Sequence, residues 1–314
     1  MLTIFSCPKP FRGHINIIQR NAIKSWTLLE PRPEIILIGD EEGTAEICKE
    51  FGLRHIPKVD RNEFGTPLVS SIFEIGQNEA TNPLVCYVNA DIILMSDFIQ
   101  AVKQINKEIC QKPFLAIGRR WDLTVDTLDF ENPDWELRLR DSIKASGKLD
   151  LPSGIDYFLF PVGLWKNMPP LILGRCYWDN WLIYDVHSRG ILVIDLTPST
   201  TVVHQTHDYS HIPGGADRII KAPEMRRNWK LQGQYYSRIF NTWDATHYFS
   251  DGLKRTGILR RMGANWIRLR YFLIILLVET LYPYSLPLNI FLKSIRGCVR
   301  FIQRNIKLVN RSCR

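Results

Sequence analysis

The sequence lacks the signatures of the common nucleotide-binding folds. No GxGxxG opens the first expected helix and no GxxxxGK[ST] occurs in the 314 residues, which argues against a classical dehydrogenase and a P-loop NTPase. The seven cysteines are scattered and form no CxxC pair, so neither a disulfide framework nor a cysteine zinc site is indicated, and a reducing compartment fits best. Residues 2–7 already look like a strand rather than a leader peptide, and we expect a cytoplasmic catalytic part.

Acidic residues are scarce at the end of the chain, and so are long apolar runs. Residues 252–314 carry thirteen Lys or Arg residues against one acid, Glu279, which interrupts the apolar stretch that starts at residue 271. A spanning helix needs about 20 apolar residues, so this tail better suits an in-plane segment on the anionic inner face of a membrane. A packed helical subdomain with solvated charges is the alternative. Nucleic acid is not expected as a partner, because aromatic residues do not interleave with the charges.

What the sequence does contain is a regular alternation of strand and helix patterns over its first 120 residues. Such alternation predicts an α/β fold with a mainly parallel sheet and helices on both faces. Residues 122–150 are polar and rich in turn formers, and we expect an irregular excursion there. The expected strands are 2–7, 34–38, 53–59, 84–88, 114–118, 157–160, 191–195 and 200–203; the expected helices are 15–29, a short one ending at 51, 67–78, 97–109 and one beginning near 179.

Asp91 follows the most strand-like of these runs, residues 84–88. Ligands of open α/β sheets bind at the carboxyl ends of the strands. A carboxylate at that place can hold Mg²⁺ or Mn²⁺ against the diphosphate of a nucleotide, because both cations prefer hard oxygen ligands. The alternative is an ordinary turn, in which Asn and Asp are common.

Two further features follow Asp91 along the chain. Asp179 lies between Trp178 and Trp181 in an aromatic setting near an expected helix start, where the helix dipole favours a carboxylate. His204 and His207 then follow an expected strand, with His211 beyond them. Because a Pro-Gly-Gly sequence comes next, we expect these histidines in a loop.

The order and spacing of these features resemble the GT-A-type glycosyltransferases close to family 2, over about residues 2–215. The blocks at residues 154–157, 172–181 and 204–211 look like those of an uncharacterised bacterial and plant branch. In that family a DxD-type motif binds a metal and the donor diphosphate, an acid in an xED-type motif is the catalytic base, and a late histidine completes the metal site.

The resemblance implies a role for each matching residue. Asp91 matches the last acid of DxD and Asp179 matches the base. His204 or His207 matches the histidine, so both are candidate metal ligands with Asp91 for Mn²⁺ or Mg²⁺. The chain departs from the family in two places. Asn89 stands at the first acid of DxD, where we expect a substrate-binding residue, and a tryptophan stands where xED has glutamate.

The chemistry of sugar transfer gives these residues physical roles. The departing diphosphate needs positive charge as its bond to the sugar breaks. The acceptor hydroxyl is a poor nucleophile at neutral pH, so a carboxylate such as Asp179 must take its proton. Trp178 and Trp181 offer flat faces for sugar stacking and exclude water, which raises the basicity of the carboxylate. The alternative places both rings in the core, with Asp179 as a helix cap.

Other residues near strand ends are weaker candidates for the donor site. Asp40 is a candidate acceptor of a hydrogen bond from a uracil-like base, and Ser6, Pro8 and Lys9 are candidates for lining the same nucleoside pocket. Asp156 is a candidate for holding sugar hydroxyls, and Arg119 and Arg120 are candidates for binding phosphate. The alternative for each is an ordinary structural role: a solvated loop acid for Asp40, the exit turn of the first strand for Ser6, Pro8 and Lys9, a structural turn for Asp156 and a surface position for the arginines.

We therefore expect two regions: a GT-A catalytic domain over residues 1–215 and a basic, partly apolar helical region over residues 216–314. The expected function is transfer of a sugar from a nucleotide-diphosphate sugar to an acceptor hydroxyl, by an inverting, metal-dependent reaction. A lipid-linked or polysaccharide precursor would be a suitable acceptor. The alternatives are a non-catalytic sugar-binding or membrane scaffold, and a metal-dependent hydrolase or sugar nucleotidyltransferase.

Overall fold

The computed structural model describes residues 2–109, 112–207, 223–235, 238–257, 260, 262–266 and 269. The chain divides into a compact unit, Met1–Ala264, and a second unit, Asn265–Arg314. His211 and the basic, partly apolar stretch from residue 271 onward lie outside the described residues. Within the described residues, no helix is long and apolar enough to cross a membrane.

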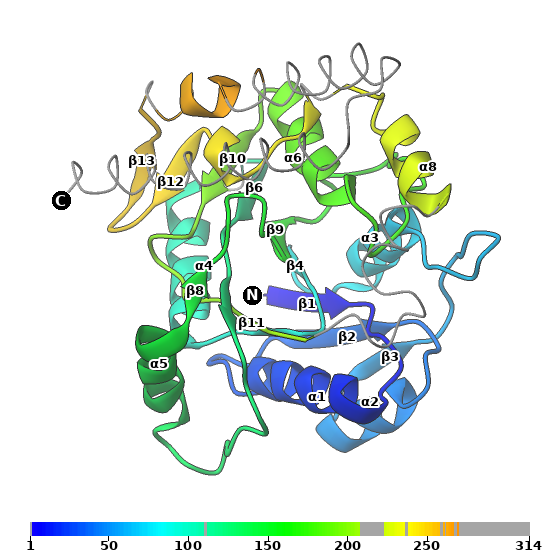
Figure 1. The fold of residues 1–314 in the computed structure, drawn as a ribbon, viewed down its shortest axis with the longest axis vertical. Coiled ribbons are helices and arrows are strands. Elements are labelled where there is room, and N and C mark those ends of the chain that lie inside the picture. The colour runs from blue at the N-terminus through cyan, green and yellow to red at the C-terminus, as the bar shows by residue number, and fades with distance from the viewer. Residues whose placement is uncertain are drawn as a thin grey trace, which may run out of the picture. The chain divides into compact units, whose positions relative to one another are not determined.

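The compact unit is built on one large sheet (Figure 1). Its strands are β1 (Leu2–Ser6), β2 (Glu34–Ile38), β3 (Arg54–Ile56), β4 (Leu84–Val88), β6 (Phe114–Ile117), β9 (Tyr157–Pro161), β10 (Leu192–Asp195), β12 (His247–Phe249) and β13 (Leu253–Arg255). They lie in the order β13-β12-β10-β6-β9-β4-β1-β2-β3. Neighbours pair in parallel except where β9 or the edge strand β13 takes part. The expectation of an α/β fold with a mainly parallel sheet is confirmed.

Strand β9 runs antiparallel between β4 and β6, with Tyr157 opposite Val88. The start of β9 therefore lies at the same sheet edge as the carboxyl ends of β1, β4 and β6. Asp156, directly before β9, and Asn89, directly after β4, meet at this edge for that reason.

Helices cover both faces of the sheet. The structure contains the helices α1 (Gly13–Thr27), α2 (Thr44–Phe51), α3 (Val69–Glu79), α4 (Ser96–Ile109), α5 (Trp135–Ser146), α6 (Trp178–Ser188) and α8 (Pro223–Leu231), with the 3₁₀ turn η2 (Thr242–Asp244). Successive strand residues face opposite sides, so Ile4 packs into the core shared with α1, α2 and α4, while Phe5 packs into the core shared with α3 and α6.

A second, four-stranded sheet contains the short strands β5 (Ile92–Ile93), β7 (Trp121–Leu123), β8 (Lys148–Leu149) and β11 (Val203–Gln205), in the order β5-β11-β7-β8. Leu139 and Ile143 of α5 share a small core with Ile93 and Val203 of this sheet. The expectation of an irregular excursion over residues 122–150 is therefore wrong, because this segment holds a helix and two strands packed on a core of their own.

The large sheet continues past residue 215, where the sequence predicted the end of the catalytic domain. β12 pairs in parallel with β10, and β13 pairs with β12. The compact unit accordingly extends to Ala264. Residues 247–255 thus add two strands to the sheet, within the region 216–314 for which the sequence analysis expected helices.

Candidate metal and catalytic site

The small sheet brings together residues that are far apart in the sequence. Asp91 lies directly before β5, which pairs antiparallel with β11 so that His204 is opposite Ile92. On its other side β11 pairs in parallel with β7, which places His204 opposite Asp122. Gln205 fixes this arrangement, because its side chain donates to the carbonyl of Asp91 (3.1 Å) and to that of Ile18 (2.7 Å).

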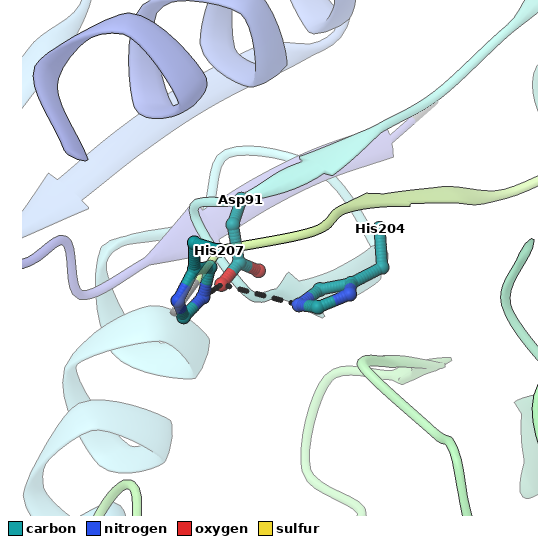
Figure 2. Close-up of side chains that lie close together, drawn as sticks. All are labelled: Asp91, His204 and His207. Atoms are coloured by element: carbon teal, nitrogen blue, oxygen red, sulfur yellow. Dashed lines mark hydrogen bonds and ion pairs between the residues drawn. The ribbon is translucent and has the colours of Figure 1, made fainter. Parts of the chain in front are cut away.

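Asp91, His204 and His207 form a cluster suited to a metal ion. One ligand atom from each lies within 4.8 Å of the others. Oδ2 of Asp91 is 3.3 Å from Nε2 of His207 and 3.8 Å from Nε2 of His204. Figure 2 shows the carboxylate of Asp91 between the two imidazole rings. The sequence placed these three residues in one site, and the structure brings their side chains together.

The electrostatics of Asp91 fit a cation-binding carboxylate. Burial opposes its ionisation, but the hydrogen bond with His207 and electrostatic interactions with His204 and Lys9 outweigh burial and hold the pKa of Asp91 below its usual range. Its second oxygen, Oδ1, is buried and has no hydrogen-bond partner among the described residues. Such an unpaired buried oxygen is costly, and coordination of a cation would satisfy it. The donor set of one carboxylate and two imidazoles therefore fits a divalent transition metal.

Asp122 and Arg120 extend the cluster. Oδ1 of Asp122 accepts a hydrogen bond from Nδ1 of His204 at 3.0 Å. Arg120 approaches three carboxylates: its Nε is 3.2 Å from Asp122, its Nη2 is 3.3 Å from Asp150, and its Nη1 donates to Asp156. Burial lowers the pKa of Arg120, but Asp156 and its other acidic neighbours outweigh burial and raise it. Arg120 therefore stays charged and links Asp122, the partner of His204, to Asp156 at the edge of the large sheet.

Asn89 faces Asp156 rather than the histidines. Its Nδ2 donates to Oδ1 of Asp156 at 2.6 Å, and its backbone N–H donates to the Asp156 carbonyl at 2.9 Å. The hydroxyl of Tyr87 donates to Oδ1 of Asn89 at 2.9 Å. The amide is therefore held on both sides, at the position where the resembling family has an acid.

Asp179 lies in the first turn of α6, as the sequence predicted. Tyr177, just before the helix, has a φ of +83°, a region that residues with a Cβ rarely adopt. Burial raises the pKa of Asp179 to about 6; the backbone N–H of Asn180 opposes this shift and the nearby negative charge of Asp156 adds to it. A carboxyl with this pKa is ionised at neutral pH yet more basic than an ordinary aspartate, which suits a general base.

Helix α8 holds the loop that leads into α6. Asn228 is fully buried; it accepts a hydrogen bond from the backbone N–H of Ile172 and donates to the carbonyls of Ile172 and Cys176. Glu224 receives two hydrogen bonds from Arg175 in the same loop. These contacts fix the backbone just before Asp179. The sequence analysis expected a helical region here but not its contact with this loop, because the buried residues of α8 are polar rather than apolar.

Several predicted donor-site residues have structural partners instead. Ser6 is fully buried and donates to the carbonyl of Val88 at 2.6 Å, which joins β1 to β4. Pro8 is buried after β1. Arg119 donates to the backbone carbonyl of Asp150. The neighbouring Arg120, rather than Arg119, contacts the carboxylates of Asp122, Asp150 and Asp156. Phosphate binding by Arg119 stays a prediction.

Asp40 and Trp178 also have identified surroundings. Asp40 is exposed after β2 and pairs with Arg61 at 2.5 Å, which lowers the pKa of Asp40. Trp178 is 6% exposed and packs against Tyr87 and Phe158. Its ring belongs to the core, the alternative that the sequence left open. Sugar stacking by Trp178 is not favoured, because its faces are covered.

Asp122 is the residue of this site that the sequence reasoning missed. It falls in the alternation Trp121-Asp122-Leu123, where an acid between two apolar residues signals a short strand with one polar face. Nothing local indicates that this face meets His204, 82 positions later.

No protein-family profile matches the chain, and no curated protein matches it in sequence. Solved structures with partial similarity include S. aureus TarS, residues 1–349, in complex with UDP (12% identity, TM-score 0.31, covering 39% of this chain and 36% of that one). A mannosyltransferase from Pyrobaculum calidifontis in complex with GDP-Man and Mn²⁺ has 13% identity and a TM-score of 0.41, covering 67% and 58%. Glucosyl-3-phosphoglycerate synthase from Mycobacterium tuberculosis, with Mn²⁺, UDP and glucosyl-3-phosphoglycerate, has 12% identity and a TM-score of 0.42, covering 76% and 80%. The chain thus spans about a third of the length of the TarS fragment.

Proposed function

We propose that this chain is a nucleotide-sugar-dependent glycosyltransferase of the GT-A type, which transfers a sugar to an acceptor hydroxyl by an inverting reaction. One observation carries the proposal. Asp91, His204 and His207, from segments more than a hundred residues apart, gather in one cluster with metal-ligand spacing beside the edge at which the strands of a mainly parallel sheet end.

The cluster suits the donor diphosphate. Asp91, His204 and His207 would hold a divalent cation, which would supply positive charge to the departing diphosphate. Two imidazoles among three ligands favour Mn²⁺ over Mg²⁺, because Mg²⁺ prefers oxygen ligands. Lys9 follows β1 and is close enough to Asp91 to lower its pKa, so its ammonium adds positive charge on the same side.

Asp179 serves as the general base of the reaction. It takes the proton of the acceptor hydroxyl as the new bond from the acceptor oxygen to the sugar carbon forms. The bond from that carbon to the diphosphate breaks, and its electron pair leaves with the nucleoside diphosphate. A single base and a direct displacement invert the configuration at the sugar carbon. The raised pKa of Asp179, about 6, supports this role, and the charges of the ion pair between Asp156 and Arg120 both act on this carboxyl.

Binding of the donor can be tested without knowing the acceptor. Thermal unfolding is followed with UDP-, GDP- and dTDP-sugars, each with and without Mn²⁺. A ligand that binds only the folded protein at about 100 times its Kd stabilises it by about 2.7 kcal/mol, so at least one donor should raise Tm when Mn²⁺ is present. A panel with no shift would contradict the donor site. Release of free sugar over many turnovers in the absence of an acceptor would instead favour a hydrolase.

The acceptor and the membrane contact remain expectations from the sequence. The basic tail is suited to an anionic lipid surface, and a lipid-linked or polysaccharide precursor would be presented there. Sedimentation with anionic and with neutral vesicles tests this expectation. A tail that binds lipid predicts that the protein sediments with anionic vesicles and is released at high salt, whereas a packed tail predicts no binding to either kind of vesicle.

A further inference from the structure

We propose that Asp122 is a positioning residue that sets the tautomer of His204, so that the Nε2 atom of this histidine is the one left to bind a cation. This inference deepens the proposed function, because it concerns the same cluster, but it can be tested independently of sugar transfer. It concerns a side chain that neither the sequence analysis nor the resemblance assigned.

The first step is the direction of the hydrogen bond. A carboxylate is acceptor-only, so at the 3.0 Å contact with Oδ1 of Asp122 the Nδ1 atom of His204 must be the donor. A neutral imidazole carries one proton. With that proton on Nδ1, the lone pair lies on Nε2, the atom that approaches Asp91.

The second step is the rigidity of Asp122. Its backbone is in β7, whose parallel register with β11 sets it opposite His204. Its Oδ1 also lies 3.2 Å from Nε of Arg120, which is held in turn by Asp150 and Asp156. Asp122 is therefore fixed by both its strand and a charged partner, as partners of metal-binding histidines commonly are.

The third step is a comparison within the chain. Asp122 and Asp150 both face Arg120, at 3.2 and 3.3 Å, and their side chains are similarly exposed, 26% and 23%. Of the two, Asp122 contacts His204. Substitution of Asp150 is therefore a matched control, because it removes one carboxylate from Arg120 and leaves the contact between Asp122 and His204 in place.

The experiment compares the wild type with Asp122→Ala and Asp150→Ala by Mn²⁺ titration, followed by the loss of the EPR signal of free Mn²⁺. Loss of an outer partner of a ligating histidine typically weakens metal binding by about 10- to 100-fold, and we expect a weakening of that size for Asp122→Ala. We expect a change of less than about twofold for Asp150→Ala. Equal affinity of Asp122→Ala and the wild type would overturn the proposal, as would an equal loss in the two variants.

A second measurement needs no metal. In ¹⁵N-histidine-labelled protein at pH 8.5, the ring nitrogen shifts of His204, assigned with His204→Gln, should show Nδ1 protonated in the wild type. They should show increased Nε2 protonation in Asp122→Ala. An unchanged tautomer in that variant would overturn the proposal.

The variant Asp122→Asn tests whether a loss of Mn²⁺ affinity in Asp122→Ala is caused by misfolding. The positive charge of Arg120 favours the side-chain oxygen of asparagine at the place of Oδ1, so this variant should keep the Nδ1 proton and most of the Mn²⁺ affinity. If Asp122→Asn lost as much affinity as Asp122→Ala while keeping the Nδ1 proton, the negative charge rather than the tautomer would be the cause, and the proposal would be overturned. If the wild type bound no Mn²⁺ at all, the proposed function would fail, while the tautomer measurement would still decide the role of Asp122.

Discussion

Asn89 donates a hydrogen bond from its side-chain amide to the carboxylate of Asp156 at 2.6 Å. Because Tyr87 donates to the other end of the same amide, Asn89 has no freedom to turn toward Asp91. The departure from the DxD pattern therefore has a physical reason. The side chain at position 89 donates a hydrogen bond to the carboxylate of Asp156, which an amide can do and an ionised acid cannot.

Restoring the acid of the family pattern should damage the site. In Asn89→Asp, a carboxylate oxygen replaces the donor 2.6 Å from Oδ1 of Asp156, and two carboxylates at that distance cannot both ionise without repulsion. We expect a lower Tm, less transfer and no gain in Mn²⁺ affinity. Thermal unfolding and Mn²⁺ titration check this. A tenfold tighter Mn²⁺ affinity would show that residue 89 does reach the cation.

Removing the base should stop catalysis and spare donor binding. Asp179→Asn keeps the shape of the side chain but cannot accept the proton of the acceptor. We expect transfer to fall by about 10²- to 10⁴-fold, with the donor-induced Tm shift unchanged. Asp185→Asn, on the same helix, serves as the control, because Asp185 contacts Trp165 and Arg189 instead. Full transfer by Asp179→Asn would refute the assignment.

The reaction should be limited at low pH by protonation of Asp179. Its pKa is raised to about 6, and only the ionised form accepts a proton, so log kcat/KM should rise with pH below about 6 and level off above it. A pH series of initial rates, within the range where the protein stays folded, measures this limb. A profile that is flat from pH 5 to 8 would contradict the role of Asp179.

Asp156 supplies the control for that profile. Its negative charge contributes to the raised pKa of Asp179, so Asp156→Asn should lower this pKa and move the limb to lower pH. A move toward higher pH would mean that the limb belongs to another group.

Ser6 should matter for stability rather than for substrate binding. Its hydroxyl is buried between β1 and β4 and donates to Val88. Ser6→Ala leaves that carbonyl without its side-chain donor, and we expect a loss of about 1 kcal/mol in the free energy of unfolding. The KM for the donor should not change. Chemical denaturation and initial-rate kinetics measure the two quantities, and a raised KM with unchanged stability would restore Ser6 to the nucleoside pocket.

The large sheet was predictable because its strands are continuous apolar runs. β4 and β1 are buried on both faces, as strands of a parallel sheet are, and such runs can be recognised locally. Helix α5 was not predictable in this way, since only Leu139 and Ile143 on it are buried. Two apolar residues four apart make too short a stripe to distinguish a helix from a polar loop.

Individual residues of the site could be predicted from the sequence, but the contacts between them could not. Asp91 and His204 stand out because of where they lie relative to strands. Their partner Asp122 does not, because the contact depends on the register between β7 and β11, and register between distant strands is a property of the whole fold. The same limit applies to Trp178, whose sequence is equally suited to a stacking face and to the core.

The most direct test of the metal site is a crystal structure of the protein grown with Mn²⁺ and UDP, with anomalous data collected at the manganese edge. We predict one strong peak bonded to Asp91 and to both His204 and His207, with diphosphate oxygens completing the coordination. A peak held by other residues, or no peak when UDP is bound, would contradict the account.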